Sequence, residues 1–566
     1  MAETLISAGV LARENDQSFI TQGPVTVGAA IVGPTAKGPV EIPTVVTSYS
    51  EYQNKFGSTI TSGSNVYSYF TSIAAYNYFQ NGGETLLVSR VVNGAYTAAT
   101  TTLDGEEGDV AVTFKTIGEG VLMNSSSSLN VDGSMDSGST DNVRWEVLNS
   151  NTGSGTFDLL VRRGNDTTND KSVLETWTNL SLDPFSSNYV AKRIGDQTST
   201  YTADGTSYYL QTSGAYPNAS RYIRVSAVDA TTPNYLDNSG FAKSAYTASI
   251  PVAQAGGFLS ATGDVKDAAK FYDEITSTDT QGLVGTDYTN MINLLSNSDD
   301  YKFNVLITPG LYDADYTTQL TSIISNTQNR GDNLFILDPV KHGATVTDVT
   351  SQAASRNTSY AASYWPWVQV IDPDTGRQVW VPASTLMAGV FAYNDSVSEP
   401  WFAPAGINRG GLGQVVRPER KLAQATRDAL YTNKVNPIAS FPGTGVVVYG
   451  QKTLQTKSTA LDRVNVRRLL IAMKSYIAGV AQNLVFEQNS AATRNNFLAQ
   501  VNPYLEGIQQ KQGLYAFKVV MDETNNTADV IDRNELIGQI YVQPTKTAEY
   551  IYLDFNVTPT GVAFPA

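Results

Sequence analysis

A stiff aromatic segment in the middle of the chain limits what this sequence can fold into. Residues 364–367 read Tyr-Trp-Pro-Trp, and such bulky side chains favour an extended strand with a large apolar surface to pack against. Residues 372–376, Asp-Pro-Asp-Thr-Gly, follow at once, and this composition predicts a sharp reversal of the chain. The run holds no nucleophile and no metal-binding or phosphate-binding pattern. It therefore indicates architecture.

The composition is that of a folded protein with several domains. A chain of 566 residues is too long for one compact core, so three or four domains are expected. Its hydrophobic share of 41% and charged share of 16% exclude a disordered chain. Cysteine is absent, which excludes disulfides and thiolate metal sites and suits a reducing cytosol.

No segment reads as a targeting or membrane-spanning element. Residues 1–4, Met-Ala-Glu-Thr, lack the basic start of a secretory signal. The longest apolar stretch, 469–486, is interrupted by Lys474, Ser475, Gln482 and Asn483, so no membrane insertion is expected.

Charge is distributed unevenly along the chain. Residues 1–350 hold 19 Lys and Arg against 37 Asp and Glu, a net charge of −18, whereas residues 351–566 hold 19 against 16, a net charge of +3. The acidic front portion argues against binding of nucleic acid, because phosphate contacts need cations. The near-neutral back portion can pack against copies of itself without strong repulsion. An acidic surface that serves only solubility is the alternative.

The first 92 residues predict an arm followed by an α/β unit. Residues 1–22 form a separate arm in which Leu5, Val10, Leu11 and Ala12 are apolar. Residues 23–92 predict a strand, a helix over 47–57, a second helix over about 66–81 and a strand over 85–92. Ser48 is placed to cap the first helix and Gly57 to end it.

The next segment changes character and then the α/β pattern returns. Residues 93–250 are rich in Thr, Ser, Asn and Gly, carry a net charge of −8 and contain short alternating runs, which predicts an inserted all-β domain. Beyond residue 251, two apolar runs at 303–310 and 333–339 flank a helical stretch at 316–330. This spacing predicts a βαβ unit in a parallel sheet, so 251–345 is expected to complete the α/β domain begun by 23–92.

Residues 346–566 are expected to form a carboxy-terminal α/β domain. Apolar residues recur at alternating spacings of four and three from Val466 to Leu484, which predicts an amphipathic helix. A second helix is expected from Ser490 to Gly513. At the chain end, 548–557 alternates, with one apolar face made of Ile551, Leu553, Phe555 and Val557.

Catalytic interpretations are weaker than this architectural one. Residues 445–453 nearly match a phosphate-binding loop, but Gln451 displaces the lysine and the valines before it favour a strand. His342 is the single histidine, which excludes a histidine metal cluster. Acid pairs such as Asp313 with Asp315, or Asp299 with Asp300, fit turns better than glycoside hydrolysis. No catalytic residue, metal site or cofactor is predicted, and the protein is not expected to be an enzyme.

Several of these segments together resemble the contractile tail sheath proteins of bacteriophages. The aromatic run with its turn, Val-Pro-Ala-Ser at 381–384 and Ala-Gly-Val-Phe-Ala at 388–392 match the central signature of that family. Asn-Val-Arg-Arg-Leu at 465–469 and Phe-Glu-Gln-Asn at 486–489 resemble its carboxy-terminal elements, the latter with Gln488 where the family often has proline. The resemblance is weakest across 93–250.

The resemblance implies an α+β multidomain fold, with an α/β sheath core, a carboxy-terminal α/β domain completed by chain-end strands, and the inserted β domain outside. It implies subunits that assemble as hexameric rings stacked into a helical sleeve around a tail tube protein, with baseplate and tail terminator proteins as further partners. Such a sleeve contracts to drive the tube through the host envelope. The expected location is the virion tail, assembled in the host bacterial cytoplasm. A tailocin sheath or another contractile injection system such as type VI secretion, and a secreted β-rich carbohydrate-binding protein, are the alternatives.

Three further expectations concern sites. The chain ends are predicted to supply or receive inter-subunit strands, with Leu5, Val10, Leu11 and Ala12 at one end and the apolar face of 548–557 at the other. The carboxy-terminal domain is predicted to face an acidic tube. The candidate contacts there are Arg463, Arg467, Lys474, Arg494 and Lys511. Residues 93–250 are expected to be a dispensable outer decoration.

Overall fold

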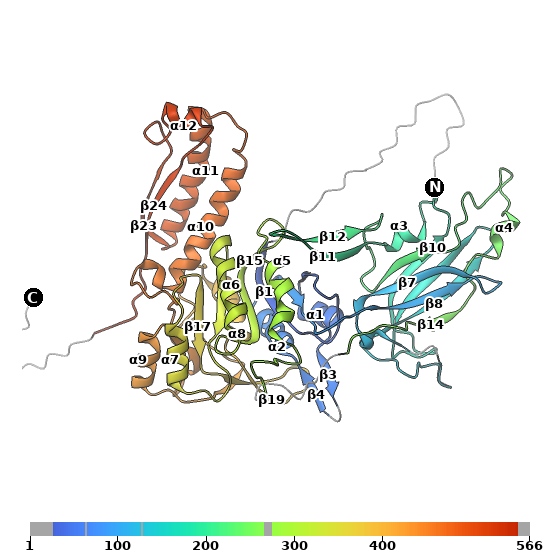
Figure 1. The fold of residues 1–566 in the computed structure, drawn as a ribbon, viewed down its shortest axis with the longest axis horizontal. Coiled ribbons are helices and arrows are strands. Elements are labelled where there is room, and N and C mark those ends of the chain that lie inside the picture. Colours follow the sequence, from blue (N-terminus) through green and yellow to red (C-terminus); the bar gives the residue numbers. More distant parts are fainter. Residues whose placement is uncertain (1–25, 63–64, 126–127, 265–273, 553–566) are drawn as a thin grey trace, which may run out of the picture.

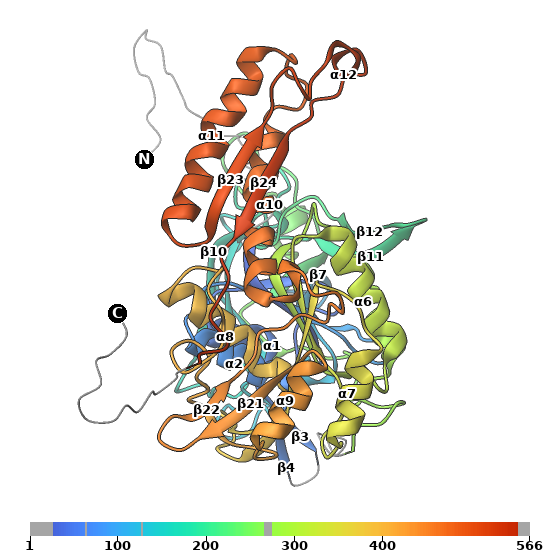
Figure 2. The ribbon, with the colours of Figure 1, turned by 90° about the vertical axis from the view of Figure 1, so that its left-hand side faces the viewer.

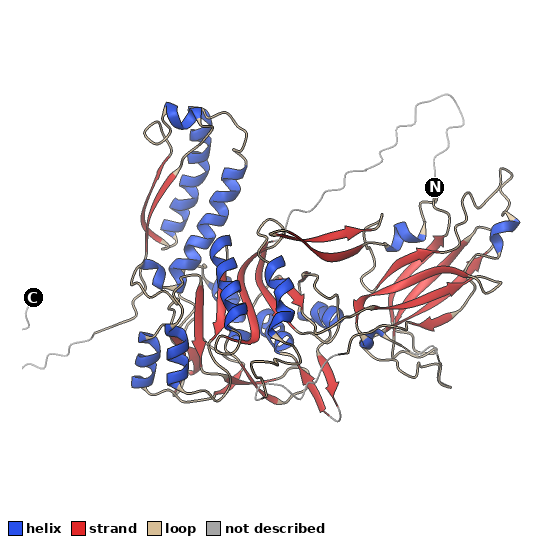
Figure 3. Ribbon diagram, in the orientation of Figure 1, coloured by secondary structure: helices blue, strands red, loops and turns tan. Residues whose placement is uncertain are grey.

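The computed structural model describes residues 26–62, 65–125, 128–264 and 274–552. The molecule has three parts: a central α/β core, a β-rich lobe on one side, and a helical lobe that rises from the other side of the core (Figure 1). Helices concentrate in the core and the helical lobe, whereas the β-rich lobe is almost entirely strands and loops (Figure 3). Within the described ranges no helix has the length and apolar character needed to cross a membrane.

An eight-stranded sheet organises the core. Its order is β2 (Thr44–Val46), β5 (Leu86–Arg90), β1 (Thr26–Gly33), β15 (Lys302–Tyr312), β16 (Leu334–Asp338), β17 (Ala361–Trp365), β21 (Val435–Phe441) and β22 (Gly445–Val448). The six inner strands are parallel, and the two edge strands are antiparallel to their neighbours. The predicted βαβ unit is confirmed: β15 and β16 pair in parallel, with Leu306 opposite Phe335.

Helices cover both faces of this sheet, which explains why its strands are apolar throughout. The first apolar layer contains α1 (Tyr49–Phe56), α2 (Phe70–Gln80) and α8 (Ser384–Val397). The second contains α5 (Thr289–Leu294), α6 (Thr317–Arg330), α7 (Val346–Ala354) and α9 (Gln424–Thr432). Ser48 caps α1 by accepting a hydrogen bond from the Glu51 amide at 3.1 Å, as the sequence predicts.

The aromatic run ties the two layers together. Trp365, the last residue of β17, packs in the second layer, and Trp367 packs in the first, so the two tryptophans lie on opposite faces of the sheet. The indole of Trp367 donates to the Val340 carbonyl at 3.1 Å. The predicted reversal joins β18 (Val368–Ile371) to β19 (Gln378–Val381), where the Gly376 amide donates to the Asp372 carbonyl at 2.9 Å. β20 (Val415–Pro418) completes this small sheet.

The second helix of the first unit starts later than the sequence pattern predicts. β3 (Thr59–Ser62) and β4 (Asn65–Ser68) pair in an antiparallel manner, and α2 begins only at Phe70. The physical reason is local preference: the Thr, Val, Tyr and Ser residues of this stretch favour paired strands over a helical turn.

The β-rich lobe is a sandwich of two sheets. One has the order β13 (Ile223–Val228), β7 (Val110–Glu119), β6 (Ala98–Asp104); the other has the order β10 (Val173–Ser181), β9 (Thr156–Arg163), β8 (Val143–Asn151), β14 (Ala255–Gly257). Phe114, Trp145 and Phe157 are buried between them. Because β14 belongs to this sandwich, the lobe extends past residue 250. The Thr97 amide donates to the Thr262 carbonyl at 3.0 Å, so the chain enters and leaves the lobe at neighbouring points.

A hairpin from this lobe packs on the core. It consists of β11 (Thr198–Asp204) and β12 (Ser207–Ser213), whose Tyr201 and Leu210 pack against the second apolar layer. Short helices fill the connections: η1 (Val121–Met123), α3 (Val190–Ile194), α4 (Ser244–Thr247), η2 (Gly285–Tyr288) and η3 (Ala460–Asp462).

One buried carboxyl group in the core titrates near neutrality. Asp338 ends β16, and its side chain accepts hydrogen bonds from the Ser384 amide at 3.1 Å and the Ser384 hydroxyl at 2.5 Å. Burial raises the pKa of Asp338 to about 7, although both hydrogen bonds oppose the shift. The folded protein therefore holds a proton on Asp338 at a pH where the unfolded chain, with a pKa near 3.8, has lost it.

This raised pKa predicts that stability falls as pH rises from about 4 to about 7, because ionisation is penalised only in the folded state. Asp338→Asn removes the titration and keeps the shape, so we expect its melting temperature to vary less with pH over that window than that of the parent. Melting curves at half-unit pH steps measure this. Parallel curves for the two proteins across the window would contradict the assignment.

Candidate subunit-linking site

The helical lobe is a pair of helices backed by a hairpin. α10 (Val464–Gln482) and α11 (Ala491–Gln510) run antiparallel, and β23 (Leu514–Val520) pairs with β24 (Gln539–Pro544) beside them, with α12 (Ala528–Asp532) at the tip (Figure 2). The apolar periodicity of the sequence supplies their common core, which contains Met473, Phe497, Val501 and Leu505. α11 ends slightly before the predicted Gly513, whose amide donates to the Ile508 carbonyl at 2.8 Å and closes the helix end.

The hairpin of this lobe has two open edges. Within the described residues β23 and β24 pair only with each other. Phe517 and Val542 pack toward the helices, while Tyr515 and Tyr541 are exposed on the other side. A two-stranded sheet is marginal alone, and an unpaired edge is a template for a further strand. Among the described strands, none pairs with the outer edges of this hairpin.

The chain leaves this hairpin along a defined path. After β24, the Thr545 hydroxyl donates to the Gln512 carbonyl at 2.7 Å. The Glu549 carboxylate is then held by three side chains from distant parts of the sequence. Arg463 donates to both of its oxygens at 2.7 and 2.9 Å, Tyr431 donates at 2.8 Å and Gln451 at 3.1 Å. We call these four residues the Glu549 clamp.

The electrostatics of the clamp favour the ionised carboxylate. Partial burial alone would raise the pKa of Glu549, but the hydrogen bonds from Arg463, Gln451 and Tyr431 outweigh it and hold the pKa below its usual range. Burial, then the nearby Glu549 charge, raises the pKa of the Tyr431 hydroxyl. Bidentate pairing of a guanidinium with a carboxylate fixes direction as well as distance. The clamp therefore sets the angle at which the chain end departs.

Beyond the clamp the side chains have no cover. Tyr550, Ile551 and Tyr552 are 66%, 76% and 88% exposed, and residues 545–552 form no strand. An apolar segment that is anchored at one point and bare beyond it is typical of proteins that link copies of themselves by strand addition.

The predicted strand residues fall mostly outside the structure. Of the apolar face of 548–557, only Ile551 lies in the described ranges; Leu553, Phe555 and Val557 lie outside them, as do Leu5, Val10, Leu11 and Ala12. The inter-subunit strands therefore stay a prediction, and Ile551 is the one residue of that apolar face that the structure describes.

The five predicted tube contacts do not form one cluster. Arg463 belongs to the clamp and also pairs with Asp462 at 2.9 Å. Arg467 is buried, donates to the Ser359 hydroxyl and lies over the Tyr360 ring at 4.0 Å. The others are dispersed: Arg494 is buried near the tip of the lobe, Lys511 pairs with Glu399 at 2.6 Å near its base, and Lys474 is exposed midway along α10.

The clamp itself was not predicted from sequence. In the sequence, Gln451 is notable only because it interrupts a phosphate-loop pattern. In the structure, its side-chain amide donates to the Glu549 carboxylate at 3.1 Å and to the Thr547 hydroxyl at 2.6 Å. Arg463 and Glu549 lie 86 residues apart, and no local spacing connects them. The one usable signal was a single carboxylate placed directly before the alternating apolar segment.

The alternative catalytic sites are not assembled. Residues 445–448 form the edge strand β22, in an extended conformation rather than a phosphate cradle. His342 packs between the rings of Trp367 and Trp380. Asp313 is buried and paired with Arg356 rather than with another acid. Among the described residues no group of three or more His, Cys, Asp or Glu is placed to hold a metal ion.

Comparison with known families identifies the class. The phage tail sheath protein central domain matches residues 281–454, and the phage tail sheath C-terminal domain matches residues 456–558. These matches cover the second half of the core and the whole helical lobe with its clamp. Residues 281–454 and 456–558 therefore match the two domains of phage tail sheath proteins, one directly after the other.

Individual relatives of this chain are also tail sheath proteins. The chain is 41% identical to the tail sheath protein of Vibrio phage KVP40 over 228 residues, which are 40% of this chain and 33% of that protein. It is 32% identical to the tail sheath protein of Salmonella phage ViI over 323 residues, 53% of this chain and 51% of that protein. The chain thus spans between a third and a half of these relatives. The fold is similar to the crystal structure of a sheath tail protein from Listeria innocua, with a TM-score of 0.52, 10% identity, and 92% of this chain and 96% of that chain covered.

The clamp geometry predicts that Glu549→Gln loosens the chain end. The substitution removes the charge from hydrogen bonds that are charge-assisted, each about 1.5–3 kcal/mol, so we expect local opening of residues 545–552 to increase at least tenfold. Hydrogen exchange of the Thr545 amide, which donates to the Gly513 carbonyl at 3.2 Å, measures it. In the parent, the same opening should appear as pH falls below the usual range of a glutamate. The lowered pKa of Glu549 means that the ionised clamp stabilises the chain end at higher pH, and this stabilisation is lost when Glu549 takes up a proton.

Glu506→Gln is the matched control, since Glu506 is exposed on α11 of the same lobe. It should leave exchange at 545–552 unchanged. If Glu549→Gln exchanged no faster than this control, the clamp would not hold the chain end.

Proposed function

We propose that this chain is a structural subunit of a contractile phage tail sheath, which polymerises as stacked rings around the tail tube and contracts to drive the tube through the host envelope. One observation carries the proposal: the segment with the two sheath domains also bears an open β-hairpin and an anchored, uncovered chain end. Each is a half of a link between subunits.

A contractile sleeve imposes two physical demands. Its contacts must be heterologous, because only head-to-tail contacts that do not close generate a helical array. Its subunits must also accept two packings while each stays rigid. The large apolar layers on both faces of the core sheet support the second part of this demand, a subunit that keeps its internal packing.

Strand addition reconciles linkage with movement. In this proposal, residues 1–22 and the segment after Glu549 extend the open edges of β23 and β24 in neighbouring subunits. Main-chain hydrogen bonds of this kind survive a reorientation that breaks side-chain contacts. The Glu549 clamp then acts as the fixed point from which the outgoing strand departs.

The remaining partners and the location follow from the same assignment. We propose that the tail tube, baseplate and tail terminator proteins contact the assembled sheath, that the sheath belongs to the virion tail, and that it assembles in the bacterial cytoplasm. The β-rich lobe lies on the opposite side of the core from the helical lobe (Figure 1). This supports an outward-facing decoration around an inward-facing carboxy-terminal domain.

Deletion of residues 1–22 tests strand linkage. If this arm acts only between subunits, the truncated subunit should melt at the temperature of the parent. We expect it to lose assembly into long sleeves, as seen by negative-stain microscopy of the purified protein. Normal contractile sleeves from the truncated protein would refute the role of this arm.

The tube-facing prediction needs exposed cations that do not support the fold. Reversing Arg463 or Arg467 would break the clamp or bury an anion, so Lys474→Glu with Lys511→Glu is the cleaner pair. Lys511→Glu also removes an exposed ion pair with Glu399, which contributes little to folding. Exposed pairs contribute about 0–1 kcal/mol each, so we expect a folded subunit with weaker assembly on purified tubes, most clearly at low salt. Sedimentation with tubes measures this.

The matched control is Lys302→Glu with Lys341→Glu, two exposed lysines of the core. It makes the same change in net charge away from the helical lobe. If both double variants co-sediment equally with the tube, Lys474 and Lys511 do not contact the tube.

A further inference from the structure

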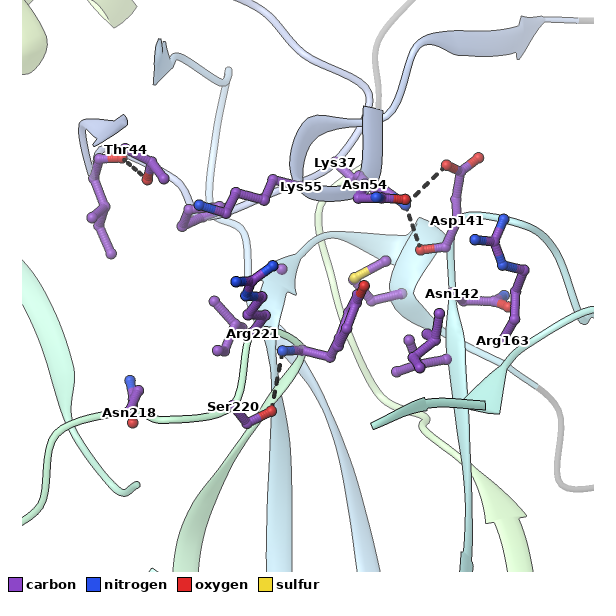
Figure 4. A pocket seen from close by; sticks show the side chains of 18 of the residues that line it. Lys37, Thr44, Asn54, Lys55, Asp141, Asn142, Arg163, Asn218, Ser220 and Arg221 are labelled. Carbon is purple, nitrogen blue, oxygen red and sulfur yellow. Dashed lines mark hydrogen bonds and ion pairs between the residues drawn. The ribbon is translucent and has the colours of Figure 1, made fainter. Parts of the chain in front are cut away.

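A pocket of about 340 Å³ lies between the core and the β-rich lobe. Lys37 and Lys55 approach it from the core side, on the loop after β1 and at the end of α1. Arg163, at the end of β9, and Arg221, before β13, approach it from the lobe (Figure 4). Both parts of the molecule thus contribute cations to one concave site.

The charge of this site is opposite to that of the chain. Among the described residues that line it, four are cations and one, Asp141, is a carboxylate, in a protein with a net charge of −15. Asp141 is already used, because the Lys37 ammonium pairs with its carboxylate at 3.1 Å and donates to its carbonyl at 3.1 Å. Lys55 pairs with Glu51 at 3.0 Å.

Two of the cations have no such compensation. Within the described ranges, the guanidinium groups of Arg163 and Arg221 make no ion pair or side-chain hydrogen bond. Burial lowers the pKa of Lys37, Asp141 opposes that shift, and the positive charge of Arg163 lowers it further. Lys37 is buried, whereas Arg221 is exposed. Like charges gathered around a buried cation cost free energy unless anions offset them.

The shape and the remaining walls suit a small ligand. Ile42, Met123 and Leu174 supply apolar wall, while Asn142 and Asn218 add amide groups. A second hollow of about 320 Å³ shares Lys55, Arg221 and their neighbours with the pocket, so the site opens into a groove. Ligand pockets in proteins typically have a volume of about 300 Å³ or more, with mostly apolar walls and a few oriented polar groups.

We propose that this pocket binds a small oxyanion, a molecule bearing a phosphate or carboxylate group, through the cations that line it from the core and from the lobe. A guanidinium presents paired N–H donors that match the oxygens of either group. Because the ligand would contact both the core and the lobe, it would fix the lobe in its position on the core. This role is separate from sheath assembly and belongs to the isolated subunit.

The test measures the melting temperature of the full-length subunit against inorganic phosphate and, separately, citrate, with chloride at matched ionic strength as reference. A ligand that binds only the folded state raises the melting temperature in a saturable way. We expect saturable stabilisation of the parent by at least one of the two anions. Arg163→Gln with Arg221→Gln should raise the concentration for half-saturation at least tenfold.

The matched control is Lys192→Gln with Arg193→Gln, which removes two exposed cations from α3 of the same lobe. It should bind like the parent. Stabilisation by phosphate alone or by citrate alone supports the proposal and identifies the anionic group. If the paired substitution fails to fold, the two single variants replace it, each expected to weaken binding.

Two results would overturn the proposal. One is a melting temperature that no anion raises above the chloride reference, or that rises equally in the Arg163 and Arg221 variant. The other is an effect of that variant on self-association in solution without any effect on anion binding. The pocket would then receive an acidic segment of a second copy instead.

Discussion

The placement of two tryptophans on opposite faces of one sheet is the constraint on which the rest of the core depends. Trp365 closes the inner strand β17 and is buried in one layer, and Trp367, two residues on, is buried in the other. Because both side chains are large and fully desolvated, the sheet must be covered on both faces by helices. Segments far apart in the sequence meet this requirement: α1 and α2 come from the first part of the described chain, and α8 and α9 come from its later part. All four pack in the two apolar layers of one core.

The covered core differs from the helical lobe, which has unpaired strand edges and an exposed chain end. In the core, both apolar layers cover the sheet, so its strands are paired and their side chains are buried. In the helical lobe, the outer edges of β23 and β24 pair with no other described strand, and the side chains of residues 550–552, which follow Glu549, are exposed. A solitary protein shields its edges. A fully covered sheet and a hairpin with unpaired strand edges thus occur in a single chain, and the hairpin is where the proposed link between subunits would form.

Local chemistry was predictable and distant pairing was not. The cap of α1 by Ser48, the parallel pairing of β15 with β16 and the apolar face of α10 each depend on residues within a few positions of one another, so the sequence pattern identifies them. The start of α2 was wrong, because strand preference in residues 59–68 overrides the helical pattern that follows. The Glu549 clamp joins Tyr431, Gln451 and Arg463 through the tertiary fold alone, and no spacing in the sequence encodes it.

Pairing between residues distant in the sequence also changes how the charge asymmetry should be interpreted. Residues 351–566 carry a net charge of +3, which suggested a basic face for an acidic tube. Much of that charge is spent inside the subunit: Arg356 pairs with Asp313, Arg463 with Glu549, and Arg468 with Asp395. The exposed cations that remain on the helical lobe, such as Lys474, are scattered, and scattered exposed charges attract weakly and through screened fields. The strong charge pairs of this chain instead join segments that are far apart in the sequence, and the pair of Arg463 with Glu549 holds the path of residues 545–552 against the core.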